Sequence, residues 1–302
     1  KQNIYSDKAY YFITVNDEDG KRIQNAVPIS GNPVAEITTF NDYTFYENET
    51  SNLFATGRRW LGEEFSLENQ QTFQIPFSNA VQNEPLKITV RAVGVSGLTS
   101  TMKVNVNSQE LFSLNFSAIS SGSDNLASDR IGSENFSNTS SAVSVLLDYD
   151  NGGNPSSRAY LDFIEISGKK QLVFDGFQFS FRNFNAANTS GIVEYQIQNS
   201  QNIYQIWEVS DHINVTSIAN ESSIGNFSFK AMGGDLKEYV VVSENDYYIP
   251  ESVANASIEN QNLHALKDIN YLLITTSEFS EQAQRIANFH IENSELTAKV
   301  VL

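Results

Sequence analysis

The stretch Ala159-Tyr160-Leu161-Asp162-Phe163-Ile164-Glu165-Ile166 largely alternates apolar and polar residues, which is typical of a β-strand with one buried face. The same pattern recurs at Leu86–Val93, Ser100–Val106 and Ala142–Asp148. Clusters of Gly, Asn, Asp and Ser separate these segments at strand-length intervals, as they do in antiparallel structure. We therefore expect residues 1–170 to form a β-sandwich or jelly-roll domain.

Three connections in this region have a composition that predicts their form. Tyr10–Val15 is expected to be a strand that turns tightly at Asp19-Gly20, with its partner strand beginning near Lys21. Asp148–Gly153 begins like a calcium loop but lacks the third side-chain ligand and the later Glu, so an Asn-Gly hairpin turn is favoured there. The stretch Ser120–Ser141 is rich in Ser, Gly and Asn, and it predicts a long mobile surface loop.

Further short strands predict a second, smaller β domain over residues 171–256, or an extension of the first one. The segments concerned are Gln171–Phe174, Phe177–Phe181, Gly191–Gln198, Ile203–Val209, Asn226–Lys230 and Glu238–Ser243.

The hydrophobic period changes in residues 257–302. Tyr271–Thr275 is a continuous apolar run, as expected for a parallel strand covered on both faces, and Ser277 is a candidate cap for the helix that follows. The apolar face of that helix lies at Phe279, Ala283, Ile286, Ala287 and His290. A strand at Lys299–Leu302 would complete one βαβ unit, which cannot bury both faces of its strands alone. We expect either an α/β domain that is completed elsewhere or a single βαβ unit that docks on the β region.

Composition excludes several classes of function. The chain of 302 residues has 36 acidic and 19 basic residues, and its net charge of −17 disfavours nucleic acid as a partner. There is no cysteine, and the three histidines occur in unrelated contexts, so we expect no metal site, cofactor or catalytic residue here. No apolar run is long enough for a transmembrane segment, and the first residues lack the apolar region of a signal peptide.

Arg58, Arg59 and Trp60 stand out in so acidic a chain and are the candidate partner-binding residues. Arg58 or Arg59 could stack on Trp60 or clamp a carboxylate, which would organise a loop or a partner surface, or they could form a local salt bridge to Glu63 or Glu64. Trp60 could also be a platform on which a sugar stacks, as in a carbohydrate-binding jelly roll.

Several segments together resemble the sortases of the bacterial type IX secretion system, which are related to the gingipain-type cysteine peptidases. They occur in the family's order along nearly the whole chain. The segments are Tyr10–Phe12 with Gly20–Ile23, Gly57–Glu63, Tyr160–Glu165, Gln178–Arg182, Trp207–Asp211, and Tyr271–Thr275 leading into Gln282–Ala287.

The resemblance implies a β-rich region followed by the first βαβ unit of a caspase-like peptidase domain. Such sortases cleave C-terminal sorting domains from exported cargo and transfer the cargo to a lipopolysaccharide on the extracellular face of the outer membrane. Their partners include an outer-membrane β-barrel shuttle protein and other members of the attachment complex. The family's catalytic histidine and cysteine motifs are absent, since the chain has no cysteine and no His-Gly pair, so we expect it to be inactive alone.

Two other functions compete with this one. A jelly roll can be a surface carbohydrate-binding or adhesion module, and binding that depends on Trp60 would favour that function. A purely structural spacer would bind neither a partner nor a glycan.

Overall fold

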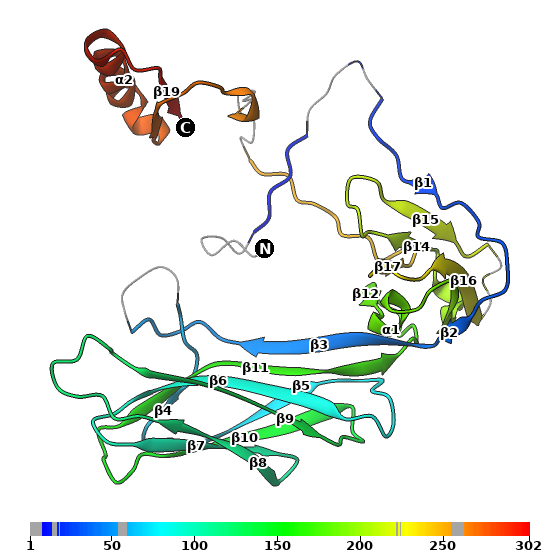
Figure 1. Ribbon diagram of the computed structural model, residues 1–302, viewed down its shortest axis with the longest axis horizontal. Coiled ribbons are helices and arrows are strands. Elements are labelled where there is room, and N and C mark those ends of the chain that lie inside the picture. The colour runs from blue at the N-terminus through cyan, green and yellow to red at the C-terminus, as the bar shows by residue number, and fades with distance from the viewer. Residues whose placement is uncertain are drawn as a thin grey trace. The chain divides into compact units, whose positions relative to one another are not determined.

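The computed structural model describes residues 8–13, 17, 19–53, 59–221, 223, 225–254 and 263–302. These residues are mainly β, as the sequence predicted, and they form two compact units, one ending at Tyr247 and one from Tyr248 to Leu302 (Figure 1). The strands of the first unit are β1 (Gln24–Asn25), β2 (Ala35–Ile37), β3 (Thr39–Glu47), β4 (Glu64–Phe65), β5 (Gln70–Pro76), β6 (Leu86–Val95), β7 (Ser100–Val106), β8 (Gln109–Phe116), β9 (Ser128–Phe136), β10 (Ala142–Asp150), β11 (Arg158–Gln171), β12 (Phe179–Arg182), β13 (Ile192–Gln198), β14 (Gln205–Glu208), β15 (Thr216–Ala219), β16 (Asn226–Met232) and β17 (Glu238–Val242). Its short helices are α1 (Phe184–Ala187) and η1 (Ser200–Asn202).

A ten-stranded sheet runs through the whole first unit. Its order is β1-β15-β14-β17-β12-β3-β11-β6-β9, and β4 pairs with β11 beside this path. A four-stranded sheet, β5-β10-β7-β8, and a three-stranded sheet, β16-β13-β2, are separate from it. β11 pairs antiparallel with both β3 and β6, so these three strands lie side by side near the β9 edge of the sheet.

The first hydrophobic core lies between the β3–β11–β6–β9 part of the large sheet and the four-stranded sheet. Fully buried side chains from β6 and β11, such as Val90 and Ile164, belong to the same cluster as Val104 of β7 and Leu147 of β10. Each apolar side chain of this size contributes about 1.5–3 kcal/mol when it leaves water. The alternating pattern that predicted these strands therefore corresponds to one buried face on each sheet.

A second core fills the part of the first unit that contains β12 to β17 and β2. It is built around four aromatic rings whose centroids lie 5.0–5.7 Å apart: Phe181, Tyr195, Phe229 and Tyr239. Such edge-to-face and stacked pairs add stability beyond the area they bury.

Strand β11 contains a bulge that changes which of its residues face the first core. Leu161 pairs with Ala92 and Phe163 with Arg91, so Asp162 is one residue extra on β11. Ala159 and Leu161 face the core before the bulge, whereas Ile164 and Ile166 face it afterwards. We call the opposite surface of β3, β11, β6 and β9 the outer face, and it carries both candidate sites described below.

Three predicted connections are wrong. Strand β9 occupies Ser128–Phe136, inside the stretch expected to be a mobile loop, because its inward Phe136 is buried in the first core. Asn151-Gly152 forms a turn but no hairpin, since β10 and β11 belong to different sheets. In the expected strand Tyr10–Val15, residues 10–13 are not in a strand and residues 14–15 lie outside the described residues.

The second unit is one βαβ unit, made of η2 (Leu263–Ala265), β18 (Tyr271–Ile274), η3 (Ser277–Phe279), α2 (Ser280–Ser294) and β19 (Ala298–Val301). β18 and β19 are parallel, as predicted. Ser277 is not the helix cap, because it lies in η3 and α2 begins at Ser280. Ala283 and Ala287 of α2 are buried, but Leu272 and Ile274 of β18 are 51% and 78% exposed. β18 is therefore not covered on both faces by the described residues.

Within the described part of the chain, no helix is long and apolar enough to cross a membrane.

Candidate functional site

Residues 48–53 and 59–65, here called the flap, fold back beside the beginning of β11. The backbone N–H of Ser51 donates to the carbonyl of Leu61, and the N–H of Leu61 donates back to Ser51. Gly62 N–H then donates to the carbonyl of Leu161 on β11. A side chain at Gly62 would begin 3.0 Å from the Asn48 carbonyl oxygen, so glycine allows this close approach. The flap thus brings Arg59 and Trp60 to the outer face.

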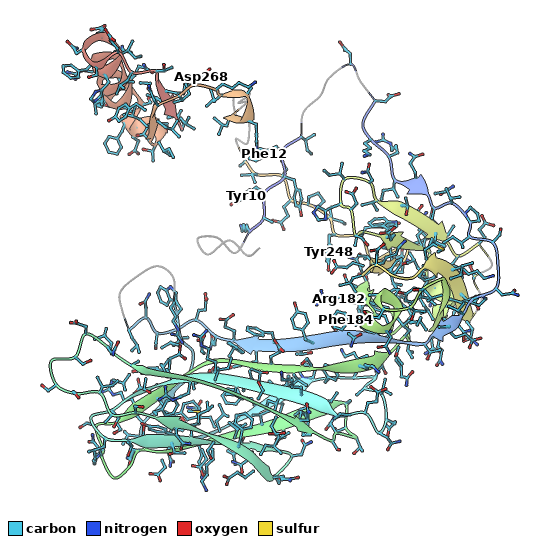
Figure 2. The ribbon with its side chains drawn as sticks, in the orientation of Figure 1. Tyr10, Phe12, Arg182, Phe184, Tyr248 and Asp268 are labelled. Carbon is cyan, nitrogen blue, oxygen red and sulfur yellow. The ribbon has the colours of Figure 1, made fainter. Side chains whose placement is uncertain are left out.

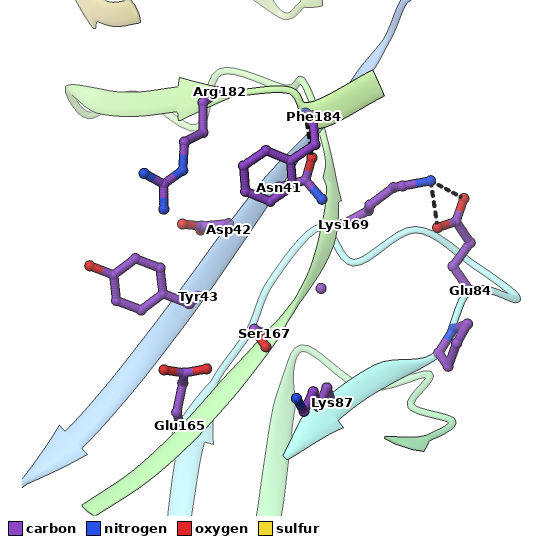
Figure 3. Close-up of a pocket in the computed structure, with 12 residues that line it drawn as sticks. Asn41, Asp42, Tyr43, Glu84, Lys87, Glu165, Ser167, Lys169, Arg182 and Phe184 are labelled. Atoms are coloured by element: carbon purple, nitrogen blue, oxygen red, sulfur yellow. Dashed lines mark hydrogen bonds and ion pairs between the residues drawn. The ribbon is translucent and has the colours of Figure 1, made fainter. Parts of the chain in front are cut away.

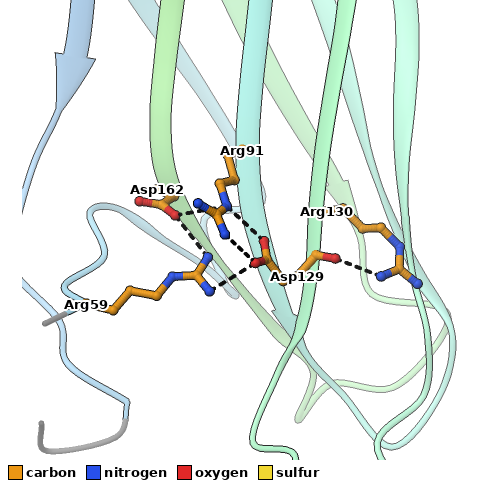
Figure 4. Close-up of polar contacts among 5 residues, drawn as sticks. All are labelled: Arg59, Arg91, Asp129, Arg130 and Asp162. Carbon is orange, nitrogen blue, oxygen red and sulfur yellow. Dashed lines mark hydrogen bonds and ion pairs between the residues drawn. The ribbon is translucent and has the colours of Figure 1, made fainter.

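Arg59 belongs to a cluster of two arginines and two aspartates on that face (Figure 4). Its guanidinium nitrogens lie 3.0 Å from Asp129 on β9 and 2.9 Å from Asp162 in the β11 bulge. Arg91 of β6 lies between the two carboxylates, 2.7 Å from Asp129 and 3.4 Å from Asp162. One ion network therefore links the flap to three neighbouring strands, β6, β9 and β11.

The network favours the ionised form of Asp129. Partial burial alone would raise the pKa of its carboxyl, but hydrogen bonds from Arg91 and Arg59 outweigh burial and lower that pKa from 3.8 to about 2. Asp162 is the more enclosed of the two acids, with a side chain only 9% exposed. A buried carboxylate needs such partners to remain charged without a large desolvation cost.

Arg59 thus clamps carboxylates, which is one of the alternatives that the sequence left open, and it does not form the other, a local salt bridge to Glu63 or Glu64. The Glu63 carboxylate instead accepts a hydrogen bond from the Tyr46 hydroxyl at 2.5 Å, and Glu64 faces Arg158 at 3.7 Å. Asp129 and Asp162 lie 70 and 103 residues from Arg59 in sequence, so no local spacing could have identified them as its partners.

The three candidate partner-binding residues have different positions. Arg58 lies outside the described residues. Arg59 has its charge engaged by the network, whereas the Trp60 side chain is 42% exposed on the same flap. Of the two described members of the predicted set, Trp60 is the more exposed.

A groove of about 600 Å³ opens elsewhere on the outer face, where β3, β6, β11, β12 and α1 meet (Figure 3). We call it the corner groove. Arg182, Asp42, Tyr43 and Glu165 follow one side of it in the view of Figure 3, while Lys169, Glu84 and Lys87 lie on the other side. The remaining lining residues are Asn41, Pro85, Ser167, Gly168 and Phe184. Sequence analysis missed this groove because its lining comes from four separate segments.

Ion pairs hold the walls of the corner groove. Lys169 Nζ lies 2.9 Å from Glu84, and Arg182 lies 3.1 Å from Glu238 on the neighbouring β17. The Asn41 side-chain oxygen accepts a hydrogen bond from the backbone N–H of Phe184 at 3.0 Å, which fixes the start of α1 against β3. The groove is therefore formed by paired strands and anchored side chains.

The described histidines and carboxylates include no group of three that could hold a metal ion. The His290 ring packs against Tyr271 with 4.6 Å between ring centroids, which is a structural role in the second unit. The Asp211 carboxyl accepts hydrogen bonds from the Asn214 side chain and the Ile213 N–H, and these lower its pKa.

The fold is that of a mainly β protein with two cores along one continuous sheet, followed by a βαβ unit. No family model and no curated protein matches the chain. Among solved structures, it is similar to dimeric latent PorU from Porphyromonas gingivalis, with a TM-score of 0.74 and 19% identity. The similarity covers 93% of this chain and 27% of the PorU chain.

At this identity the comparison shows a PorU-like fold over nearly the whole chain. Xylan-related modules of the CBM36 type, one of them from a Trinervitermes trinervoides hindgut metagenome, match 42–43% of the chain with TM-scores of 0.28–0.29. Those values are too low to support an argument about function.

Proposed function

We propose that this chain is the non-catalytic β-rich portion of a type IX secretion sortase. In this function it positions the peptidase domain and docks partners on the extracellular face of the bacterial outer membrane. The observation that supports the proposal most strongly is the PorU-like fold over 93% of the chain. The chain spans only 27% of the PorU chain, so the rest of such a sortase has no counterpart here.

The second unit supports the positioning role. Leu272 and Ile274 of β18 and Phe289 of α2 leave large apolar surfaces exposed, and the two parallel strands have no further strand beside them among the described residues. Parallel sheets are normally covered on both faces. In the proposed function, the remaining strands and helices of a caspase-like peptidase domain cover these surfaces.

The chemistry of such a sortase would come from outside this chain. Its thiolate would attack the peptide bond before the sorting domain, which leaves with an amine protonated by the histidine, and an amine of the acceptor would then take the cargo from the resulting thioester and release the thiol. This chain has no cysteine to supply the thiolate. We therefore expect no thiol-dependent cleavage or transfer when the purified chain is given a sorting-domain peptide, and measurable turnover would contradict the proposal.

The flap is the proposed docking surface for an attachment-complex partner such as the outer-membrane β-barrel shuttle protein. The ion network fixes Arg59 and thereby presents the exposed Trp60, and aromatic residues are the side chains that most often anchor interfaces. Contact with lipopolysaccharide phosphates would need local basic patches or bridging cations, because the net charge is −17.

Co-purification of the chain with the shuttle protein tests this surface. We expect Trp60→Ala to weaken the complex at least tenfold, since a central aromatic anchor contributes about 2 kcal/mol or more. Tyr204→Ala is the matched control, because Tyr204 is also 42% exposed but belongs to another part of the unit. Equal binding by the two variants would show that Trp60 is not a docking residue.

The double variant Arg58→Ala with Arg59→Ala tests whether the two arginines contribute to docking. Loss of Arg59 leaves Arg91 as the remaining partner of Asp129 and Asp162 in the network and detaches the flap from it, so the flap should loosen and the complex should weaken together with local stability. Unchanged assembly would mean that the arginines have no part in docking.

A further inference from the structure

Two partly exposed aromatic side chains border the corner groove. Tyr43 on β3 is 56% exposed and Phe184 at the start of α1 is 45% exposed. The Arg182 guanidinium lies over the Phe184 ring, 5.7 Å from its centroid; both residues are labelled in Figure 2. Exposed aromatic faces are common, but here two of them border one concave site rather than being scattered singly.

The groove also offers polar side chains that are free to bind. The side chains of Tyr43, Lys87, Glu165 and Ser167 make no hydrogen bond or ion pair with another described residue, and all four line the groove. Together they supply an ammonium donor, a carboxylate acceptor and two hydroxyls. A ligand rich in hydroxyl groups, each of which donates and accepts, satisfies such a mixed set.

The local charge is balanced although the whole chain is strongly acidic. Lys169 pairs with Glu84 and Arg182 pairs with Glu238, and the free Lys87 is matched by the free Glu165. An anionic or cationic ligand would therefore gain little from the groove as a whole. The balance favours an uncharged ligand.

The floor of the groove disfavours an extended peptide. β11 and β6 are internal strands that have neighbours on both sides, so the floor that they form presents no free edge for strand addition, whereas β3 pairs with β12 only at Asn41. The mixed lining likewise disfavours a wholly apolar ligand, which would leave Lys87 and Glu165 desolvated without partners.

We propose that the corner groove binds a neutral saccharide, with sugar rings stacked on Tyr43 and Phe184 and their hydroxyls bound by Lys87, Glu165 and Ser167. The volume of about 600 Å³ lies in the usual range of 300–1,000 Å³ for small-ligand sites. The site is separate from Trp60, which lies on the flap, and it does not depend on the proposed sortase function.

Affinity gel electrophoresis in soluble neutral polysaccharides tests the proposal. The probes are barley β-glucan, arabinoxylan, galactomannan and pullulan, with polygalacturonate as the anionic comparison. At least one neutral polymer should retard the wild-type chain, and Tyr43→Ala should raise its dissociation constant about tenfold through loss of ring stacking. Glu165→Gln, which keeps the shape of the side chain, should weaken binding severalfold by removing the charged acceptor.

Tyr204→Ala is the matched control, because it removes an exposed aromatic ring from another part of the first unit and should leave retardation unchanged, and Trp60→Ala tests the flap as an alternative sugar-binding surface. Thermal melts of all variants distinguish lost binding from lost folding. The proposal is overturned if no neutral polymer retards the chain, if only polygalacturonate does, or if Trp60→Ala and not Tyr43→Ala abolishes retardation. It is also overturned if Tyr43→Ala selectively loses the shuttle protein, which would make the groove a protein interface.

Discussion

Asp129 is the residue whose charge the outer face stabilises most clearly, and Asp129→Asn tests the ion network directly. The pKa of this carboxyl falls from 3.8 to about 2 in the folded chain. That difference corresponds to about 2.4 kcal/mol if one pH unit is worth 1.36 kcal/mol. The side chain is 37% exposed, however, so solvent screening reduces the expected contribution to about 1 kcal/mol.

The sign of the pH dependence follows from the direction of the pKa shift. A carboxyl whose pKa is lower in the folded state stabilises the fold above its unfolded pKa and loses that contribution as pH falls through its folded pKa. The contribution of Asp129 should therefore be complete above about pH 4 and be lost progressively between pH 4 and pH 2.

Urea denaturation of wild type and Asp129→Asn at pH 7, 4 and 3 measures this effect. We expect a difference of about 1 kcal/mol at pH 7, or roughly 2–4 °C in melting temperature, which shrinks at pH 3. Asp124→Asn is the control, because Asp124 is exposed and outside the network. A difference that stays constant from pH 7 to pH 3, or an equal effect of Asp124→Asn, would refute the role assigned to the network.

Three further substitutions test the packing inside each of the two units. Gly94→Ala should lower the free energy of unfolding by about 1–3 kcal/mol in urea denaturation, because the new Cβ would lie 2.5 Å from the Phe116 ring. Gly97→Ala is the control and should be tolerated, because a Cβ at Gly97 meets no atom within 4 Å. Tyr239→Phe should leave the free energy of unfolding unchanged or raise it by about 1 kcal/mol, because the buried Tyr239 hydroxyl has no hydrogen-bond partner among the described residues. A decrease of more than about 1 kcal/mol in the free energy of unfolding would reveal a partner. Ile274→Ser should change the stability of the second unit by less than about 0.5 kcal/mol in thermal melts, because Ile274 is 78% exposed, and a large loss would show that this face is covered in solution.

Sequence patterns predicted strands where the hydrophobic period was regular. Ser100–Val106 was predicted with the bounds that β7 has, and the predicted β10 differs from the observed one only at its end. β9 was missed because it has few apolar residues: Ile131 faces outward and is 61% exposed, and the inward face includes Gly132, beside which Phe112 and Leu114 pack. Tertiary packing, rather than local composition, makes this segment a strand.

The candidate sites were less predictable than the strands. Arg59 and Trp60 were recognisable as unusual residues in an acidic chain, but the partners of Arg59 depend on a bulge and on strand pairing between distant segments. The corner groove depends on β12 pairing with β3 at a single position, Arg182 opposite Asn41. The hydrophobic periodicity within one segment cannot predict a pairing between two segments that lie far apart in sequence.

The bulge at Asp162 explains how one strand supports two different surfaces. Because successive side chains of a strand point to opposite faces, one extra residue changes the face to which each later side chain of the strand points. Before the bulge, Leu161 faces the core; after it, Ile164 and Ile166 do so, which leaves Glu165 and Ser167 for the corner groove. Without Asp162, one half of β11 would turn its apolar residues to solvent and bury the polar ones. The same residue supplies the carboxylate that holds Arg59, so the flap and the groove both depend on this single irregularity in the sheet.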